Sequence, residues 1–179
     1  MKTMVALLAL ALSLPAFAQN PPKQKPTTLR GILLEDLKTT HNQEDWFAPA
    51  SVAVDGLTPE QVNWKSGPNS HSIGQLTYHI LFWDKQSLAK FKGETPEKFS
   101  GNNDDTFNDF DSKKWNDTVR ELDEVMTGLE KVVENADDKQ LAEWASTIEH
   151  IATHNAYHIG QIVYVRKEQG SWNPAKGVK

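Results

Sequence analysis

Three histidines recur at four-residue intervals near the end of the sequence, in the segment HIATHNAYHIGQ that covers residues 150–161. On an α-helix, positions four apart lie on one face, whereas positions eight apart are separated by about 12 Å along the axis. His150, His154 and His158 therefore cannot all reach one metal ion. Either neighbouring pair could supply two imidazole ligands, which are common ligands of metals in proteins.

The apolar residues of the same segment indicate which pair faces inward. The buried direction of the helix is marked by its aliphatic residues, which are Ile148, Ile151, Ile159, Ile162 and Val165. On a helical wheel, His158 lies about 60° from that direction, His154 about 100° and His150 about 140°. The pattern therefore predicts His154 and His158 as the ligand pair, with His150 towards solvent or the rim.

A third ligand is available in the segment QLTYHILFWD, where His79 shares an apolar helical stripe with Leu76 and Phe82. Taken alone, His79 is typical of a core histidine bonded to a backbone carbonyl. Together with the HxxxH pair it gives three neutral nitrogen donors, and one divalent ion satisfies all three. The combination favours a metal site with one position open for water or substrate. Zinc is the default metal, while nickel, iron and manganese also suit imidazole.

The remaining candidates carry weaker signals. The zinc-protease motif HExxH is excluded, because Ile151 and Asn155 follow the first two histidines of the stripe. Gln161 lies one turn beyond His158 and is either a contact of the site or a surface glutamine. We expect His71 to face solvent at a helix start.

No general base is identifiable from the sequence. Asp84, His150 and His41 qualify only if the fold brings them near the metal ligands. His41 could approach the site together with Glu44, but an exposed pair is the favoured interpretation.

The elements that must position these residues are helical. Apolar spacing predicts a first helix from Leu29 to Val54, disturbed at Pro49, a second from Ile73 to Phe91, and a third over the stripe from Trp115 to Val133. Ser72 with Gln75, and Ser146 with Glu149, resemble capping boxes that open the second and last helices, the last continuing to about Glu168. We therefore predict an all-α fold, a four-helix bundle with a long connection, residues 93–111, between helices two and three.

Export is predicted from the N-terminus. Residues 1–18 have the order of a signal peptide, with an apolar run too short to span a bilayer and Ala16-Phe17-Ala18 before the expected cleavage site. A Pro-rich linker over residues 19–27 precedes a domain over 28–170, and residues 171–179 form a C-terminal tail. We expect a secreted, periplasmic protein with no membrane span after cleavage.

Composition excludes some classes of function. The chain has no cysteine, so it has neither thiolate ligands nor a thiol nucleophile. A formal charge of −5 without a basic cluster argues against nucleic-acid binding. A homodimer is compatible with so small a bundle, although the residues define no interface.

Two segments together resemble the DinB-like family of metal-binding four-helix proteins. NSHSIGQLTYHILFWDKQSL is similar to the family's second helix, and IEHIATHNAYHIGQI to its last helix with the HxxxHxGQ-like ending. LTPEQVNWKSGPNSHSIGQL also looks like the family's connection between helices one and two. The resemblance covers residues 28–170 and implies a metal site of His79, His154 and His158. The distance along the helix axis and the helical wheel select His154 and His158 on the last helix, and the resemblance to the family supports His79 as the third ligand.

The expected function is a metal-dependent hydrolase of a small molecule whose identity the sequence does not give. The family includes transferases and isomerases that use low-molecular-weight thiols, but such cofactors are scarce outside the inner membrane, where this chain is expected. The alternatives are a non-catalytic metal- or ligand-binding protein of the envelope, a thiol-dependent transferase, or an interaction bundle without metal.

Overall fold

The computed structural model describes residues 25–106 and 110–176. All of the regular secondary structure in these residues is helical, which confirms the all-α prediction for the described part of the chain. The expected signal peptide and most of the Pro-rich linker lie outside the described residues. The elements are α1 (Leu29–His41), α2 (Ala50–Val54), α3 (Pro59–Asn63), α4 (Ile73–Phe91), η1 (Asn103–Thr106), α5 (Ser112–Asn135), α6 (Asp138–Glu168) and η2 (Pro174–Lys176).

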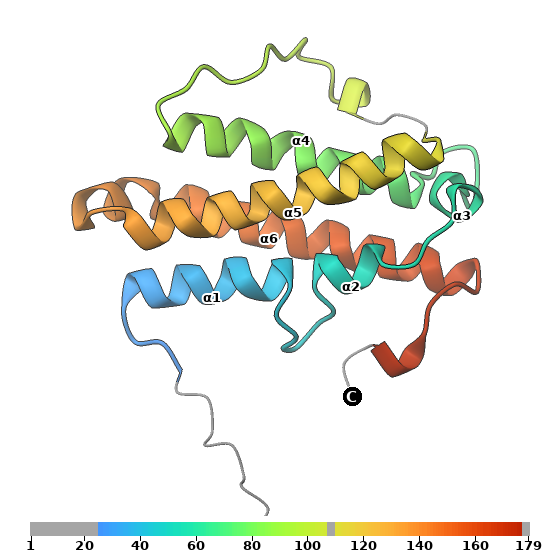
Figure 1. Cartoon of the computed structure of the whole chain (residues 1–179), viewed down its shortest axis with the longest axis horizontal. Coiled ribbons are helices and arrows are strands. Elements are labelled where there is room, and N and C mark those ends of the chain that lie inside the picture. Colours follow the sequence, from blue (N-terminus) through green and yellow to red (C-terminus); the bar gives the residue numbers. More distant parts are fainter. Residues whose placement is uncertain (1–24, 107–109, 177–179) are drawn as a thin grey trace, which may run out of the picture.

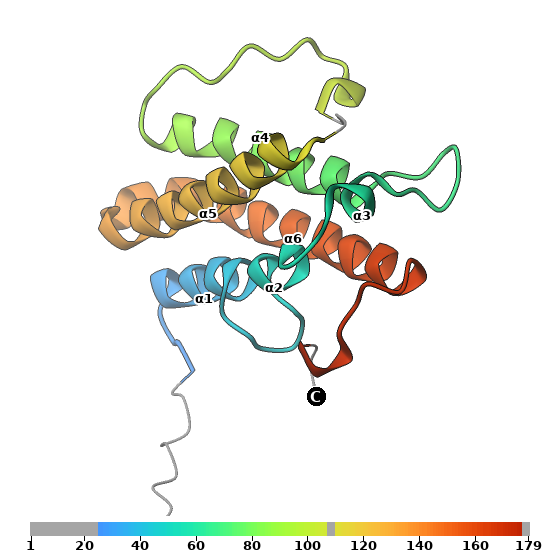
Figure 2. The same cartoon turned by 45° about the vertical axis from the view of Figure 1, so that its right-hand side comes forward.

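The long helices lie alongside one another (Figure 1). Helices α1 and α4 each pack against both α5 and α6, and the short α2 continues roughly along the line of α1 in both views (Figures 1 and 2). Helices α4 and α5 run in the same direction, because the connection between them carries the chain back along the outside of α4. The long connection predicted from the sequence thus determines the relative direction of two helices.

Helix α4 starts where the sequence predicts. The Ser72 hydroxyl accepts from the Gln75 backbone N–H, and the Gln75 side chain accepts from the Ser72 N–H, so both groups of the capping box are satisfied. Gly74 in the first turn permits close packing, since a Cβ there would lie 2.4 Å from the Phe110 ring and 2.6 Å from Val62. This contact fixes the start of α4 against α3 and the end of the long connection.

The predicted first helix is divided in two. Helix α1 ends at His41 and α2 begins at Ala50, with Pro49 as its N-cap. The prediction of a continuous helix to Val54 was wrong. Proline disfavours the helical conformation in Ala48, the residue before it, but α1 already ends seven residues earlier, at His41, whose ring is bonded to two carboxylates of α5. Helix α3 was not predicted, although Thr58 and Gln61 form a capping box around Pro59 at the first helical position.

The last helix begins earlier than predicted. Asp137 and Gln140 form the capping box that opens α6, so Ser146 and Glu149 lie inside the helix and cap nothing. Leu141 and Ile148, seven residues apart, are both buried on the same helical face. The apolar stripe therefore extends two turns upstream of the predicted start. It leads back to the capping box of Asp137 and Gln140, which the sequence offered as clearly as that of Ser146 and Glu149.

Two clusters of buried apolar residues hold the helices together. One cluster joins α2, α3 and the first part of α4 to the first half of α5 and the last part of α6. The other joins α1 to the last part of α5 and the first half of α6. Among the described helices, none combines the length and the apolar character needed to cross a bilayer.

Candidate metal centre

The three histidines predicted as ligands come together between α4 and α6. One nitrogen from each of His79, His154 and His158 lies within 4.8 Å of the others, and Nε2 of His154 lies 3.2 Å from Nε2 of His79. The ring centroids are 4.6 to 5.2 Å apart. His79 is buried and the other two are half-buried, so the cluster sits at the edge of the core.

The rotation of α6 brings its two histidines to this position. Ile151, Ile159 and Ile162 are buried in the core, which directs the flank carrying His154 and His158 towards α4. His150, one turn earlier, is exposed, with 76% of its side chain accessible, as the wheel predicts. The buried stripe of the helix therefore selects which two of its three histidines meet His79.

The hydrogen bonds of His79 determine which nitrogen carries its proton. Its Nδ1 lies 2.8 Å from the Thr106 hydroxyl oxygen, and that hydroxyl lies 2.7 Å from the Asn103 carbonyl oxygen. A hydroxyl has one proton, which Thr106 donates to the carbonyl, so Nδ1 of His79 must be the donor towards Thr106. The lone pair of His79 is therefore on Nε2.

The two histidines of α6 are held in the same tautomer. Nδ1 of His158 donates to the Gln161 side-chain oxygen at 2.7 Å, and Nδ1 of His154 is 3.3 Å from the Asn155 side-chain oxygen. The Asn155 amide in turn donates to Asp84 at 2.8 Å. Each Nδ1 thus has an acceptor, which leaves Nε2 as the ligand nitrogen of each ring.

The electrostatics favour neutral imidazoles. Burial, followed by the charges of His158, His154 and His71, lowers the pKa of His79 to about 4. Burial also lowers the pKa of His154 and of His158, although their hydrogen bonds to Asn155 and Gln161 act in the opposite direction. At neutral pH the rings are therefore in the form that binds a metal ion.

The donor set fits a divalent cation. Two Nε2 lone pairs 3.2 Å apart cannot form a hydrogen bond with each other, and the low pKa of His79 disfavours a proton between them. Three neutral nitrogens with oriented rings are the protein ligands of an open zinc site. Imidazole also suits nickel, iron and manganese, so the donor set does not identify the metal. Metal binding by these residues stays a prediction.

A cavity of about 320 Å³ adjoins the cluster. Its wall contains His154 and is completed by Trp83, Asp84, Ser87, Thr147, His150 and Ile151. Trp83 packs edge-on against His79, and Phe99 from the long connection packs against Trp83 with centroids 5.0 Å apart. The space beside the histidines is therefore largely apolar, with hydroxyls and one exposed imidazole on its wall.

Several other candidates lie elsewhere. The expectation that His41 is exposed was wrong, since it is 2% exposed and bonded to Glu130 and Asp123 of α5, while Glu44 is exposed. Its partners follow it by more than eighty residues, so its local sequence did not reveal them. His71 is exposed as expected.

Asp84 lines the cavity but is not available as a simple base. It is 1% exposed, and burial raises its pKa to about 7. Gln161 does contact His158, which was one of the two interpretations left open by the sequence.

Two residues of the centre were not found by sequence reasoning. Thr106 lies in the polar connection, which has no periodicity from which its position could be inferred. Asn155 follows His154 directly and is fully buried. The sequence could have indicated the role of Asn155, because it is a polar residue in a stripe of isoleucines that is predicted to be buried.

A family model of the DinB superfamily matches residues 48–162, more than half of the chain. The chain belongs to the DinB superfamily. The resemblance seen in the two histidine segments is thereby confirmed, and the matched region contains all three histidines. It begins just before α2, so α1 of this DinB-superfamily protein lies outside the match, as does the end of α6. The comparisons with curated proteins and with solved structures found no match.

Proposed function

We propose that this protein binds one divalent metal ion through His79, His154 and His158 and uses it to hydrolyse a small molecule. The observation that carries the proposal is the cluster itself, in which one ring nitrogen from each histidine lies within 4.8 Å of the others. Each Nδ1 has an oxygen partner, which leaves Nε2 of each ring as the proposed ligand. Membership of the DinB superfamily, whose members often bind metals, supports it. Zinc is the metal we propose, since it commonly takes three protein ligands and keeps one position open.

Different residues would bind the metal ion, orient its ligands and receive the substrate in such a site. His79, His154 and His158 would hold a divalent ion, which would lower the pKa of bound water towards neutrality and polarise a carbonyl or phosphoryl oxygen. Thr106, Asn155 and Gln161 hold the rings in the ligating tautomer. The cavity beside His154 would receive the substrate, with Trp83 as its apolar wall.

We further propose that the protein acts outside the cytoplasm, in the periplasm. The support is the signal-peptide pattern of residues 1–18. This location also makes thiol-dependent transfer the less suitable chemistry. We infer that α1, α4, α5 and α6 correspond to the four helices of the predicted bundle, because each of these helices packs against at least two of the others.

A non-catalytic envelope protein that binds metal is the second candidate. It is favoured by the cavity wall, whose carboxylate, Asp84, is fully buried and bonded to Asn155. A metal ion would then serve mainly to link α4 to α6, whose ligands His79 and His154 are 75 residues apart in the sequence.

The two candidates are separated by activity measurements on metal-loaded protein. Carboxyl ester, lactone, amide and phosphoester model substrates should be screened with the parent, with His158→Ala, and with Glu143→Ala as the control, an exposed residue of the same helix that does not line the cavity. Hydrolysis lost in His158→Ala and in the metal-free parent but kept in Glu143→Ala is the result we expect. Equal turnover by all forms would contradict the hydrolase proposal. No turnover, with a large loss of thermal stability on metal removal, would favour the second candidate.

A further inference from the structure

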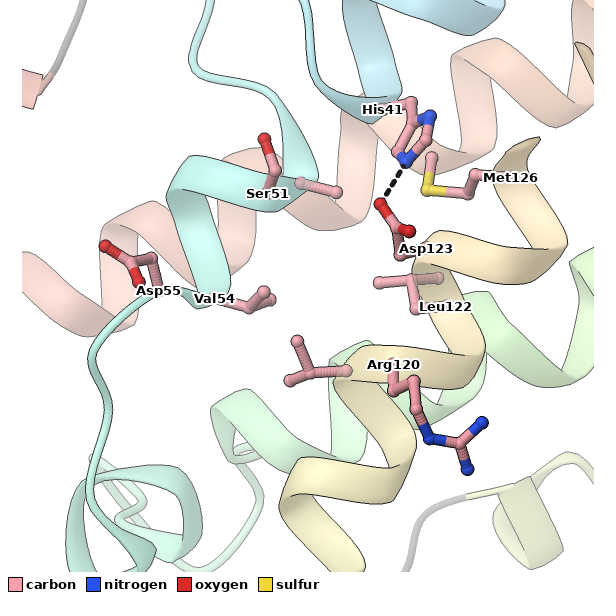
Figure 3. Close-up of a pocket in the computed structure, with 10 residues that line it drawn as sticks. His41, Ser51, Val54, Asp55, Arg120, Leu122, Asp123 and Met126 are labelled. Atoms are coloured by element: carbon pink, nitrogen blue, oxygen red, sulfur yellow. Dashed lines mark hydrogen bonds and ion pairs between the residues drawn. The ribbon is translucent and has the colours of Figure 1, made fainter.

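A second cavity lies between α2 and α5, on different elements from the histidine cluster (Figure 3). Its volume is about 320 Å³, at the lower end of the range of small-molecule sites. The walls are mainly apolar, and Val54 and Leu122 point towards one another across it. The other apolar lining residues are Ala50, Val119 and Met126.

One end of this cavity is polar, and it is built around His41. The ring is buried, and its Nδ1 and Nε2 lie 2.7 Å from Glu130 and 2.9 Å from Asp123. Burial lowers the pKa of His41, but the hydrogen bonds to the two carboxylates outweigh it, so its pKa is raised. Both nitrogens donate to carboxylates in the imidazolium form. The group of three then carries one excess negative charge.

The arrangement is not a nucleophilic triad, although Ser51, His41 and Asp123 all line the cavity. A histidine that activates a serine needs one nitrogen to accept the hydroxyl proton. Both nitrogens of His41 are bonded to carboxylates, and the Ser51 hydroxyl points away from the ring (Figure 3). The polar end is therefore suited to binding rather than to covalent chemistry.

The charges around the mouth are balanced except at this end. Asp55 is paired with Lys176, and Arg120 is bonded to Glu124 and directed away from α2 (Figure 3). Asp123 accepts from His41 through one oxygen, and 66% of its side chain is accessible. Its carboxylate can therefore still accept a hydrogen bond from a molecule in the cavity.

We propose that this cavity binds a small amphiphilic cation, a primary amine with a short aliphatic body. The aliphatic part would pack between Val54 and Leu122, and the ammonium group would donate to Asp123. An anion would meet the excess negative charge of the His41 group, so carboxylates of the same length should be rejected. The site shares no lining residue with the metal centre and does not depend on the proposed function.

The test uses the full chain loaded with zinc, n-hexylamine as the probe, and n-hexanol and n-hexanoate as comparisons of equal length. Binding is followed at pH 7 by two-dimensional NMR with assigned amides. We expect saturable shifts of residues 50–54 and 119–126 with hexylamine, weaker binding of hexanol, and the weakest binding of hexanoate. Hexanoate binding as tightly as hexylamine, or shifts that do not saturate, would overturn the proposal.

Two variants locate the ammonium group. Asp123→Asn keeps an acceptor for His41 but removes the charge, and it should weaken hexylamine about threefold to tenfold while leaving hexanol unchanged. Glu134→Gln, the same change elsewhere on α5, should bind like the parent. Equal affinities in the two variants would contradict the assignment.

A third variant separates this site from the metal. Amines can also bind to zinc, so binding must persist in His154→Ala, and its loss there would show that the probe binds at the metal centre instead.

Discussion

The buried carboxyl group of Asp84 should make the stability of the protein depend on pH, by an amount that follows from its pKa. It lies between α4 and α6 with one oxygen accepting from Asn155 and the other, Oδ1, buried without a hydrogen-bond partner. Burial raises its pKa to about 7, opposed by the Asn155 hydrogen bond and the charge of His41. Against an ordinary aspartate pKa of about 3.9, ionising it in the folded protein costs about 4 kcal/mol.

The sign of the effect follows from proton linkage. Because the folded state binds the proton more tightly than the unfolded state, the stabilisation is full below about pH 4 and is lost as the pH rises through about 7. Between pH 5 and pH 8 the loss due to Asp84 is about 3 kcal/mol. The lowered pKa of His79 acts in the opposite direction below about pH 6.5, so the parent curve alone does not isolate Asp84.

The variant Asp84→Asn isolates the contribution. Asparagine keeps the size of the side chain and a carbonyl that accepts from Asn155, but it does not titrate. Urea unfolding of metal-free protein at pH 5, 6, 7 and 8 should show the variant gaining about 3 kcal/mol relative to the parent across the range. Asp117→Asn should show a constant difference from the parent, because Lys113 lowers the pKa of Asp117 and its carboxylate stays ionised from pH 5 to pH 8. A difference between Asp84→Asn and the parent that is flat with pH would refute the reasoning.

Three further predictions concern the site and its support. Thr106→Val should weaken zinc binding about 10- to 100-fold in chelator competition, because it removes the acceptor of His79 Nδ1, whereas Thr106→Ser should stay near the parent. Calorimetric titration of zinc at pH 6 in two buffers should detect little proton release, since the pKa values of the ligands are lowered. Three ordinary histidines would release about two protons there, and that result would contradict the low pKa of His79. Gly74→Ala should destabilise the fold by about 1–3 kcal/mol in urea unfolding, because its Cβ would meet Phe110. No loss of stability would show that the ring moves freely.

The sequence predicts the parts of this fold that depend on local periodicity and caps. The bounds of α4 follow from Ser72 and its apolar residues, and the rotation of α6 follows from its isoleucines. The rotation of α6 is what allowed His154 and His158, rather than His150, to be predicted as the partners of His79. The break between α1 and α2 was underestimated, because the effect of Pro49 on a chain with continuing apolar residues depends on tertiary packing.

Features that depend on distant contacts were beyond sequence reasoning. The long connection has no periodicity, so the contact of Thr106 with His79 could not be inferred. His41 was expected to be exposed, yet α5 supplies both of its carboxylate partners. The cavity between α2 and α5 arises from the same packing and has no signal in either helix alone.

The central claim is that His79 and the two histidines of α6 hold one metal ion, and metal content tests it most directly. The parent, His79→Ala, His154→Ala and the control His150→Ala should be purified without a histidine tag, incubated with zinc, desalted and measured by mass spectrometry. We predict about one equivalent in the parent and in the control, and far less in the other two variants. No metal in the parent, or equal metal in all four proteins, would contradict the account.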